Sequence, residues 1–230
     1  MKLSVIIPAY NEEKTINELI KRVQAVKLGK IKKELIVVDD ASSDKTKEIV
    51  SNLKQIKLVS HKINKGKGSA IRTGIKLATG DIMIIQDADL EYSPEEYSKL
   101  LTPILNKETE VVYGSRFMST FFEKKHLTVP THYLGNLLLS SITRLLFSYK
   151  ITDMETCYKI FTKNALNGIS LKATRFDFEP EITAKFLKKG IKIKEIPIAY
   201  KPRKFEEGKK ISWRDGVKAL YFLLKYRFTN

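Results

Sequence analysis

Apolar and polar positions along the first half of the chain follow a pattern typical of repeated strand, loop and helix units. Four apolar runs have the length of strands: residues 3–7, 34–38, 56–59 and a run that begins near 81. After the first run, apolar side chains repeat with helical spacing at Ile16, Leu19, Ile20 and Val23. Short, uninterrupted apolar runs are typical of strands buried on both faces of a parallel sheet. We therefore predict an α/β fold with a mostly parallel central sheet flanked by helices.

The second half of the chain has less regular elements. Residues 111–116 predict another strand. Residues 117–130 lack periodicity and predict a loop that covers the ligand-binding site. Ile191, Ile193 and Glu195 alternate as in a half-buried strand. Residues 133–147 and 212–228 predict two helices rich in apolar side chains. Two interpretations stay open for both helices: packing on the domain core, or lying in the headgroup region of a membrane.

Length and cysteine content limit the class of protein. At 230 residues the chain can form one large α/β domain or two small ones. The single cysteine, Cys157, excludes an internal disulfide and a cysteine-based zinc cluster. No apolar stretch approaches the roughly 20 residues that a membrane-spanning helix needs, and the first apolar run ends at Pro8. We expect neither a membrane span nor a signal peptide.

The net charge of +16 indicates an anionic partner: nucleic acid, an anionic membrane surface or a phosphorylated substrate. A lysine-rich composition is also typical of thermophiles and AT-rich genomes. A nucleic-acid-binding module ranks last, because aromatic residues are not interleaved with the basic ones in a stacking pattern. Acidic residues after the predicted strands would also repel a phosphate backbone, so we expect no nucleic acid partner.

Three acidic residues end the apolar run near 81, at alternate positions: Asp87, Asp89 and Glu91. If the backbone stays extended, the three side chains point to one side and repel one another unless a cation lies between them. Mg²⁺ or Mn²⁺ prefers such oxygen ligands together with substrate phosphates. The alternative is a solvated loop, or a cap for the helix that starts near Pro94.

Two further segments have residues suited to a nucleotide. Asp39 and Asp40 follow the second strand, where α/β sheets bind ligands, and carboxylates accept hydrogen bonds from a base or a ribose. The segment 64–74 contains glycines, Lys67 and Arg72, which suit an anion at a helix N-terminus. It has no Walker pattern, and an ordinary glycine-containing turn stays open.

Five motifs, taken in order, resemble those of family-2 glycosyltransferases, and most closely the dolichol-phosphate mannosyltransferase-like branch, which makes polyprenyl-phosphate-linked sugars. They are the segments 8–12 (PAYNE), 37–44 (VVDDASSD), 64–68 (NKGKG), 87–90 (DADL) with Pro94 and Glu95, and 114–116 (GSR). The resemblance covers nearly the whole chain. It implies one GT-A domain over residues 1–230, with a nucleotide-sugar half at 1–115, an acceptor half at 116–211 and an amphipathic C-terminal helix at 212–230.

The resemblance also implies roles for individual residues. The nucleotide would contact Pro8, Tyr10, Glu12, Asp39 and Asp40, with Lys67 nearby. Asp87 and Asp89 would meet the metal, Mg²⁺ or Mn²⁺, and the donor diphosphate. Glu91 stands where glutamine is common, as a third candidate ligand. Arg203 and Lys209 match the basic pair that meets substrate phosphates, whereas residues 130–132 have no counterpart of a further arginine.

The acceptor decides which chemistry is needed. A sugar hydroxyl needs a base, for which Asp153 or Glu155 are candidates. A lipid monophosphate needs only cations, because its second pKa is about 6, and Arg116, Arg203 and Lys209 are suitable. The positive charge favours the phosphate, and the catalytic set we predict is Asp89, Arg116, Asp153 and Arg203.

The predicted enzyme is therefore an inverting, metal-dependent hexosyltransferase. It uses a GDP-mannose or UDP-glucose type donor and a polyprenyl or dolichyl phosphate acceptor. We expect it to be cytoplasmic and peripheral at the membrane face, with a separate membrane partner subunit as an alternative means of attachment. A second candidate enzyme transfers the sugar to a glycan or polysaccharide hydroxyl.

Overall fold

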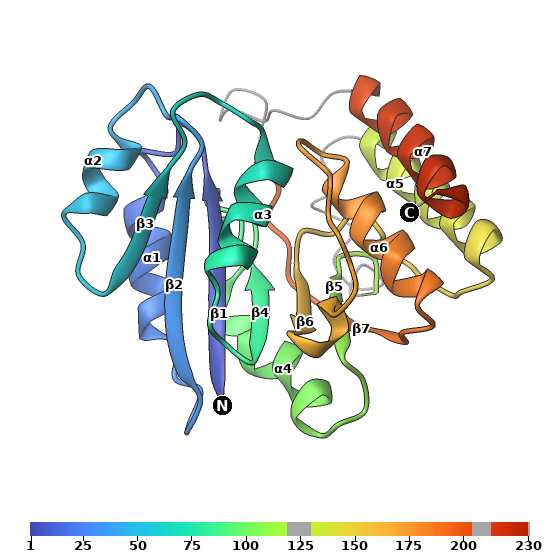
Figure 1. Cartoon of the computed structure of the whole chain (residues 1–230), viewed down its shortest axis with the longest axis horizontal. Helices are drawn as coiled ribbons and strands as arrows, with labels where there is room; N and C mark the ends of the chain where they lie inside the picture. The colour runs from blue at the N-terminus through green and yellow to red at the C-terminus, as the bar shows by residue number, and fades with distance from the viewer. Residues whose placement is uncertain (119–129, 204–212, 230) are drawn as a thin grey trace.

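The computed structural model describes residues 1–118, 130–203 and 213–229 of the 230-residue chain. One seven-stranded sheet, built from the first two of these segments, has the strand order β3-β2-β1-β4-β6-β5-β7 (Figure 1). Its strands are β1 (Lys2–Ala9), β2 (Lys32–Asp39), β3 (Ile56–Ser60), β4 (Ile82–Ile85), β5 (Val111–Ser115), β6 (Lys159–Thr162) and β7 (Ile193–Pro197).

The sheet is mostly parallel. β1 pairs in parallel with both β2 and β4, and β2 with β3, so these four strands end at the same edge. β6 is antiparallel to both of its neighbours, β4 and β5, whereas β5 and β7 are parallel. The strands predicted at 3–7, 34–38, 56–59 and 111–116 are confirmed within two residues at each end.

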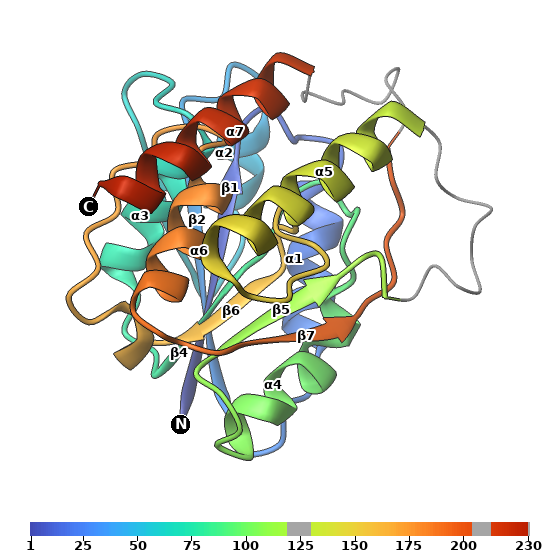
Figure 2. The same cartoon turned by 90° about the vertical axis from the view of Figure 1, so that its right-hand side faces the viewer.

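Helices cover both faces of the sheet (Figures 1 and 2). They are α1 (Ile16–Ala25), α2 (Thr46–Ser51), α3 (Lys67–Leu77), α4 (Tyr97–Leu105), α5 (Pro130–Phe147), α6 (Phe178–Lys188) and α7 (Trp213–Phe228). Helices α1, α2 and α4 pack on one face, while α3, α5, α6 and α7 pack on the other. Side chains alternate along β1, so Val5 and Ile7 join the first core and Ile6 the second.

The two apolar helices of the second half lie side by side, since α7 packs on both α5 and α6 (Figure 2). Among the α7 side chains that the structure describes, Ala219, Leu223 and Tyr226 are buried. Core packing is therefore confirmed for one face of α7, whereas the apolar side chains of Val217, Tyr221 and Leu224 are exposed. No helix in the described ranges is both long and apolar enough to cross a membrane.

Candidate active site

The carboxyl ends of β1, β2 and β4 meet at one edge of the sheet because these strands are parallel neighbours. Pro8 is buried inside β1, and Tyr10, just beyond the strand, is 38% exposed. Asp39 ends β2 and is buried, as is Glu12 in the loop after β1. The structure thus places the predicted donor-binding residues of the first two strands along the same edge.

Asp40 is also buried at this edge, but its carboxylate is used by the protein itself. Its oxygens accept hydrogen bonds from the backbone N–H groups of Lys65 (2.9 Å) and Gly66 (2.6 Å), and one lies 2.6 Å from His61 Nδ1. Gly66 has φ 91°, and a Cβ there would lie 2.4 Å from the Thr174 carbonyl oxygen, so glycine is required. Asp40 shapes the glycine loop that begins α3, and its predicted contact with the nucleotide gains no support from this geometry.

The acidic segment after β4 does not continue as a strand. β4 ends at Ile85, and the chain then turns, with Leu90 at φ 63°. Buried Gln86 fixes the start of the turn, since its Oε1 accepts hydrogen bonds from the hydroxyls of Tyr97 (2.8 Å) and Tyr158 (2.7 Å). The condition under which residues 87, 89 and 91 would point to one side, an extended backbone, is therefore not met.

Lys67, the first residue of α3, neutralises Asp87. Its Nζ lies 2.9 and 3.0 Å from the two Asp87 oxygens, 3.4 Å from Glu179 Oε1 and 2.9 Å from Cys157 Sγ. Burial alone would lower the pKa of Lys67, but interactions with Asp87, Cys157 and Glu179 together outweigh burial and raise this pKa well above its ordinary value. Lys67 is thus held as a cation beside the acidic turn.

A second cation, Arg203, bridges two carboxylates. Its Nη1 lies 3.1 Å from Glu12 Oε2, and its Nη2 lies 3.1 Å from Asp89 Oδ2. Burial lowers the pKa of Arg203, but Asp89 and Glu12 together raise it. The bridge joins the loop after β1, the acidic turn and the segment after β7, which are far apart in the sequence.

The Glu91 carboxylate holds the segment that follows β7 by hydrogen bonds. Its Oε2 accepts a hydrogen bond from the Tyr200 hydroxyl and its Oε1 one from the Arg203 backbone N–H, both at 2.8 Å. Its backbone carbonyl accepts a third, from Lys201 N–H at 3.0 Å. The prediction that Glu91 is a metal ligand is not supported here, because both carboxylate oxygens hold the segment 200–203.

Asp87 and Asp89 remain suitable for a divalent cation. Burial, together with the charges of Asp87 and Glu91, raises the pKa of Asp89 to about 7, although the charge of Arg203 opposes this shift. Among the described residues, no group of three or more His, Cys, Asp or Glu side chains is arranged to hold a metal ion. The two aspartates would therefore hold Mg²⁺ or Mn²⁺ together with oxygens of a substrate diphosphate.

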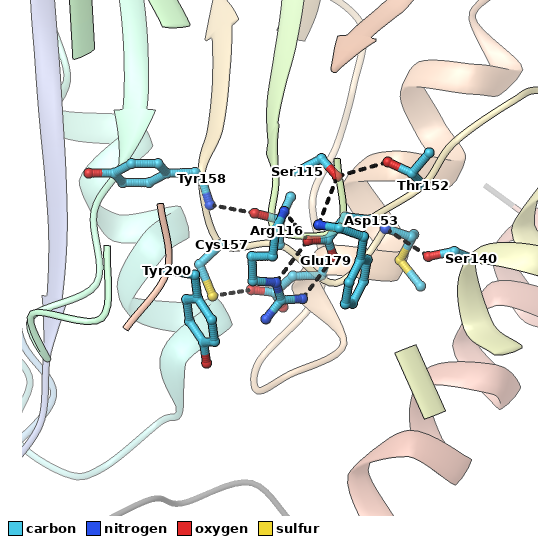
Figure 3. A network of polar contacts seen from close by, with 12 residues as sticks. Ser115, Arg116, Ser140, Thr152, Asp153, Cys157, Tyr158, Glu179 and Tyr200 are labelled. Atoms are coloured by element: carbon cyan, nitrogen blue, oxygen red, sulfur yellow. Dashed lines mark hydrogen bonds and ion pairs between the residues drawn. The ribbon is translucent and has the colours of Figure 1, made fainter. Parts of the chain in front are cut away.

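Arg116 follows β5 and is locked by Asp153 (Figure 3). Asp153 is fully buried, and its oxygens accept hydrogen bonds from the Arg116 backbone N–H (2.9 Å), Nε (2.8 Å) and Nη2 (2.7 Å). The guanidinium lies 5.2 Å from the centre of the Tyr200 ring, whose hydroxyl binds Glu91. Burial alone would lower the pKa of Arg116, but Asp153, together with Tyr92 and Tyr200, outweighs burial and raises this pKa well above its ordinary value. Tyr200 thus connects this cation to the acidic turn.

Two further buried ionisable groups, Glu155 and Lys159, follow Asp153 in the chain. Burial and then the charge of Glu179 raise the pKa of Glu155 to about 8, although Lys159 opposes the shift. Burial lowers the pKa of Lys159 to about 8, and its Nζ donates hydrogen bonds to the carbonyls of Met154 and Thr156, both at 2.8 Å. A pKa near neutral pH suits a general base, and the pKa of Glu155 lies in that range.

Some predicted residues cannot be placed, and some contacts were not predicted. Lys209 and nearly all of the predicted loop 117–130 lie outside the described residues. The contacts of Glu179, Glu195 and Tyr200 come from tertiary structure. One signal was available for Glu195, which falls in phase with Ile191 and Ile193 on the inward side of an alternating strand.

A mostly parallel sheet with helices on both faces and acidic residues after its parallel strands is the GT-A-like α/β fold that the sequence predicted. The chain belongs to glycosyl transferase family 2, whose model matches residues 4–169. The UDP-N-acetylglucosamine--dolichyl-phosphate N-acetylglucosaminyltransferase of Methanococcus voltae is 33% identical, over 96% of this chain and 94% of that protein. The dolichol-phosphate mannosyltransferase of Pyrococcus furiosus is 31% identical, over 91% of this chain but 59% of that protein. The predicted resemblance to this branch is confirmed.

Solved structures show the same fold. The glucosyl-3-phosphoglycerate synthase of Mycobacterium tuberculosis, in complex with Mn²⁺ and uridine-diphosphate-glucose, superposes with a TM-score of 0.75 at 20% identity. The alignment covers 100% of this chain and 80% of that one. The same enzyme with Mg²⁺ and uridine-diphosphate gives a TM-score of 0.74 at 19% identity. At this level of identity the likeness establishes the fold alone.

Proposed function

We propose that this chain transfers a hexose, with inversion at the anomeric carbon, from a nucleotide-sugar to a polyprenyl phosphate. The two relatives above are named for dolichyl-phosphate or dolichol-phosphate acceptors, which supports a lipid phosphate here. Residues 1–115 would hold the donor and residues 116–211 the acceptor. The names differ in their sugar, so the donor stays open among GDP-mannose, UDP-glucose and UDP-N-acetylglucosamine types.

The observation that carries this proposal is that the Asp153 carboxylate is buried and hydrogen-bonded to Arg116. Its two oxygens are buried and both accept hydrogen bonds from Arg116, so it is poorly placed to remove a proton from a hydroxyl. A phosphate monoester is largely dianionic at neutral pH and needs no base. What it needs is a fixed cation, and Arg116 suits bidentate phosphate binding.

The acidic turn would serve the leaving group. Asp87 and Asp89 would hold a divalent cation, which would supply Lewis-acid stabilisation for a departing nucleoside diphosphate. Arg203, now bound to Glu12 and Asp89, has the charge and position to contact phosphate oxygens instead. Lys67 keeps Asp87 oriented in the meantime.

A donor and acceptor screen tests the proposal. Purified protein is mixed with each nucleotide-sugar, Mn²⁺ and a short-chain polyprenyl phosphate, and the glycolipid is quantified; short glycans serve as competing acceptors. We expect one donor to give a polyprenyl-phosphate sugar. Transfer to glycans, with none to the lipid phosphate, would reverse the choice of acceptor.

One observation favours the second candidate, transfer to a hydroxyl. Glu155 has a pKa raised to about 8, which suits a general base. If Glu155→Gln abolishes glycan transfer in that screen, Glu155 is the base of a hydroxyl-directed enzyme. If Glu155→Gln leaves transfer to polyprenyl phosphate intact, the primary proposal stands.

We also propose that the outer faces of α5 and α7 bind a membrane surface. On α7, the exposed apolar side chains Val217, Tyr221, Leu224 and Phe228 form a stripe with helical spacing. On α5 the exposed leucines are Leu134, Leu137, Leu138 and Leu145. Exposed cations among the described residues on or near the two helices include Arg144, Lys150, Lys218, Lys225 and Arg227. Apolar stripes beside cations suit an anionic headgroup region, where each cation adds about 1 kcal/mol.

Flotation with anionic liposomes tests the surface. We expect binding at low salt, release at high salt, and loss of binding in the double variant Tyr221→Gln, Leu224→Gln. The control is Ile63→Gln, which removes a side chain that is 66% exposed in the loop after β3. Failure of the wild type to float at low salt would favour a separate membrane partner subunit.

A further inference from the structure

Glu195 in β7 is a carboxylate to which the proposed reaction gives no role, yet its hydrogen bonds converge on one neighbouring turn. Its Oε2 accepts from the Thr152 backbone N–H at 2.8 Å. Its Oε1 accepts from the Thr152 hydroxyl and from the Asp153 backbone N–H, both at 2.9 Å. Within the described ranges Glu195 forms no ion pair, and its hydrogen bonds come from residues 152 and 153.

One path leads from this turn to the guanidinium of Arg116. The backbone of Asp153 is fixed by Glu195, and the side chain of Asp153 in turn receives the Arg116 backbone N–H, Nε and Nη2. Asp153 is fully buried, so it has no solvent-facing alternative position. The orientation of the guanidinium therefore depends on where β7 holds residue 153.

A second path runs through hydroxyl groups to the backbone after Arg116 (Figure 3). Because Thr152 donates its hydroxyl proton to Glu195, the 2.8 Å contact between Thr152 Oγ1 and Ser115 Oγ must be donated by Ser115. Ser115 Oγ then accepts from the N–H groups of Phe117 and Met118, each at 3.3 Å. An acceptor-only carboxylate at 195 sets the direction of this chain of hydrogen bonds.

We infer that Glu195 is a positioning residue that fixes Arg116 for the acceptor phosphate, an inference whose consequence for catalysis rests on the proposed function. Bidentate contacts between arginine and phosphate require the guanidinium plane to be held in one orientation. Both paths from Glu195 end on Arg116 or on the residues that follow it. Glutamine at 195 would turn an N–H group toward donors that now meet oxygen.

The first test measures Arg116 itself and needs no substrate. The Arg116 Nε–H signal is assigned by its loss in Arg116→Lys, and its hydrogen exchange is followed by NMR. We expect Glu195→Gln to accelerate this exchange by roughly fivefold, because one hydrogen bond that supports the turn is lost. The matched control is Glu34→Gln, which removes a carboxylate that accepts similar bonds from Ser4, Thr79 and Gly80 at the other side of the sheet. Unchanged Arg116 exchange in Glu195→Gln overturns the inference.

The second test separates positioning from general stability. In the transfer assay Glu195→Gln should raise KM for polyprenyl phosphate on the order of tenfold and leave the Kd for the nucleotide-sugar unchanged. Glu34→Gln should change neither. Combined with Arg116→Lys, Glu195→Gln should add little, because its effect passes through Arg116. Fully additive effects would contradict the inference. Faster Arg116 exchange in a protein that does not glycosylate polyprenyl phosphate would uphold the positioning role and refute the proposed acceptor.

Discussion

Residues 1–115 and residues 116–229 contribute to the same sheet but place their charged side chains in different ways. In the first region the acidic groups follow strand ends, as Asp39 follows the apolar part of β2 and Asp87 follows β4. In the second region the charges form buried networks between distant segments, such as Arg116 with Asp153 and Glu181 with Lys185 and the 172–173 backbone.

The difference follows from strand direction. Parallel neighbouring strands all end at one edge of the sheet. A polar residue directly after each strand therefore lies at the site because of its position in the sequence alone. Strand β6 is antiparallel to β4 and β5, so its beginning, and not its end, lies at this edge. The turn that precedes β6, residues 152–158, therefore lies at the same edge. Charges on that turn are enclosed by protein, and they persist only where partners satisfy them.

The largest effect on stability should come from breaking a buried pair of the second region. Asp153→Asn leaves the Arg116 guanidinium, whose side chain is 12% exposed, without its charged partner. We expect a loss of about 3–5 kcal/mol in the free energy of unfolding, measured by urea denaturation. A loss below about 1 kcal/mol would show that Arg116 finds another partner and that the network is not what holds this region.

The first region should respond in function instead. Asp89→Asn keeps the shape but removes one charge of the acidic turn, so kcat should fall by about 100-fold, or about 2.7 kcal/mol. Donor binding with Mn²⁺ should weaken in calorimetry. Asp81→Asn, the same substitution at the exposed opposite end of β4, is the control. Full activity of Asp89→Asn, or of the wild type in excess chelator, would contradict the assignment.

Acid should destabilise the first region through Glu34. Burial alone would raise the pKa of Glu34, but hydrogen bonds from Lys2, Ser4 and Thr79 lower it from 4.5 to about 2. A depressed folded-state pKa contributes stability above about pH 4.5 that is lost as the pH falls toward 2. Glu34→Gln should therefore be less stable than the wild type by about 1–2 kcal/mol at pH 7, and the difference should shrink at pH 3. Parallel urea curves at both pH values check this expectation.

The sign is opposite for Glu155 in the second region, where the folded-state pKa is raised from 4.5 to about 8. The folded protein then binds this proton more tightly than the unfolded chain, so stability falls as the pH rises from about 4.5 to 8. Glu155→Gln should remove this dependence and be more stable than the wild type by about 1 kcal/mol at pH 8. Equal slopes of stability against pH in the two proteins would rule out the raised pKa.

The smallest effect should come from an exposed pair. Lys194 and Glu108 form an ion pair whose side chains are 47% and 39% exposed. Solvent screens such a pair, so Glu108→Gln should leave the urea midpoint unchanged within error. A clear loss of stability would mean that exposure is not what separates weak pairs from strong ones in this protein.

Much of the first region was predictable from sequence. The apolar runs of β1 to β3 and the helical spacing of Ile16, Leu19, Ile20 and Val23 each depend on neighbours in the chain, and the structure matches them. The acidic segment after β4 could not be predicted in this way, because residues distant in the sequence hold the start of its turn. Gln86 is held by Tyr97 and by Tyr158, which is 72 residues away, and the acidic residues after it do not continue the strand.

By itself, the sequence determined the α/β class, the family and the edge of the sheet at which Asp39, Asp87 and Asp89 lie, because periodicity and strand-end position are local properties. Only tertiary structure decided that Asp40 shapes the glycine loop, that Glu91 holds residues 200–203 and that Asp153 binds Arg116. The same carboxylate can bind a metal, a backbone N–H or an arginine. Its partner is fixed by which segments the fold brings within about 3 Å, and residue type and spacing alone do not contain that distance.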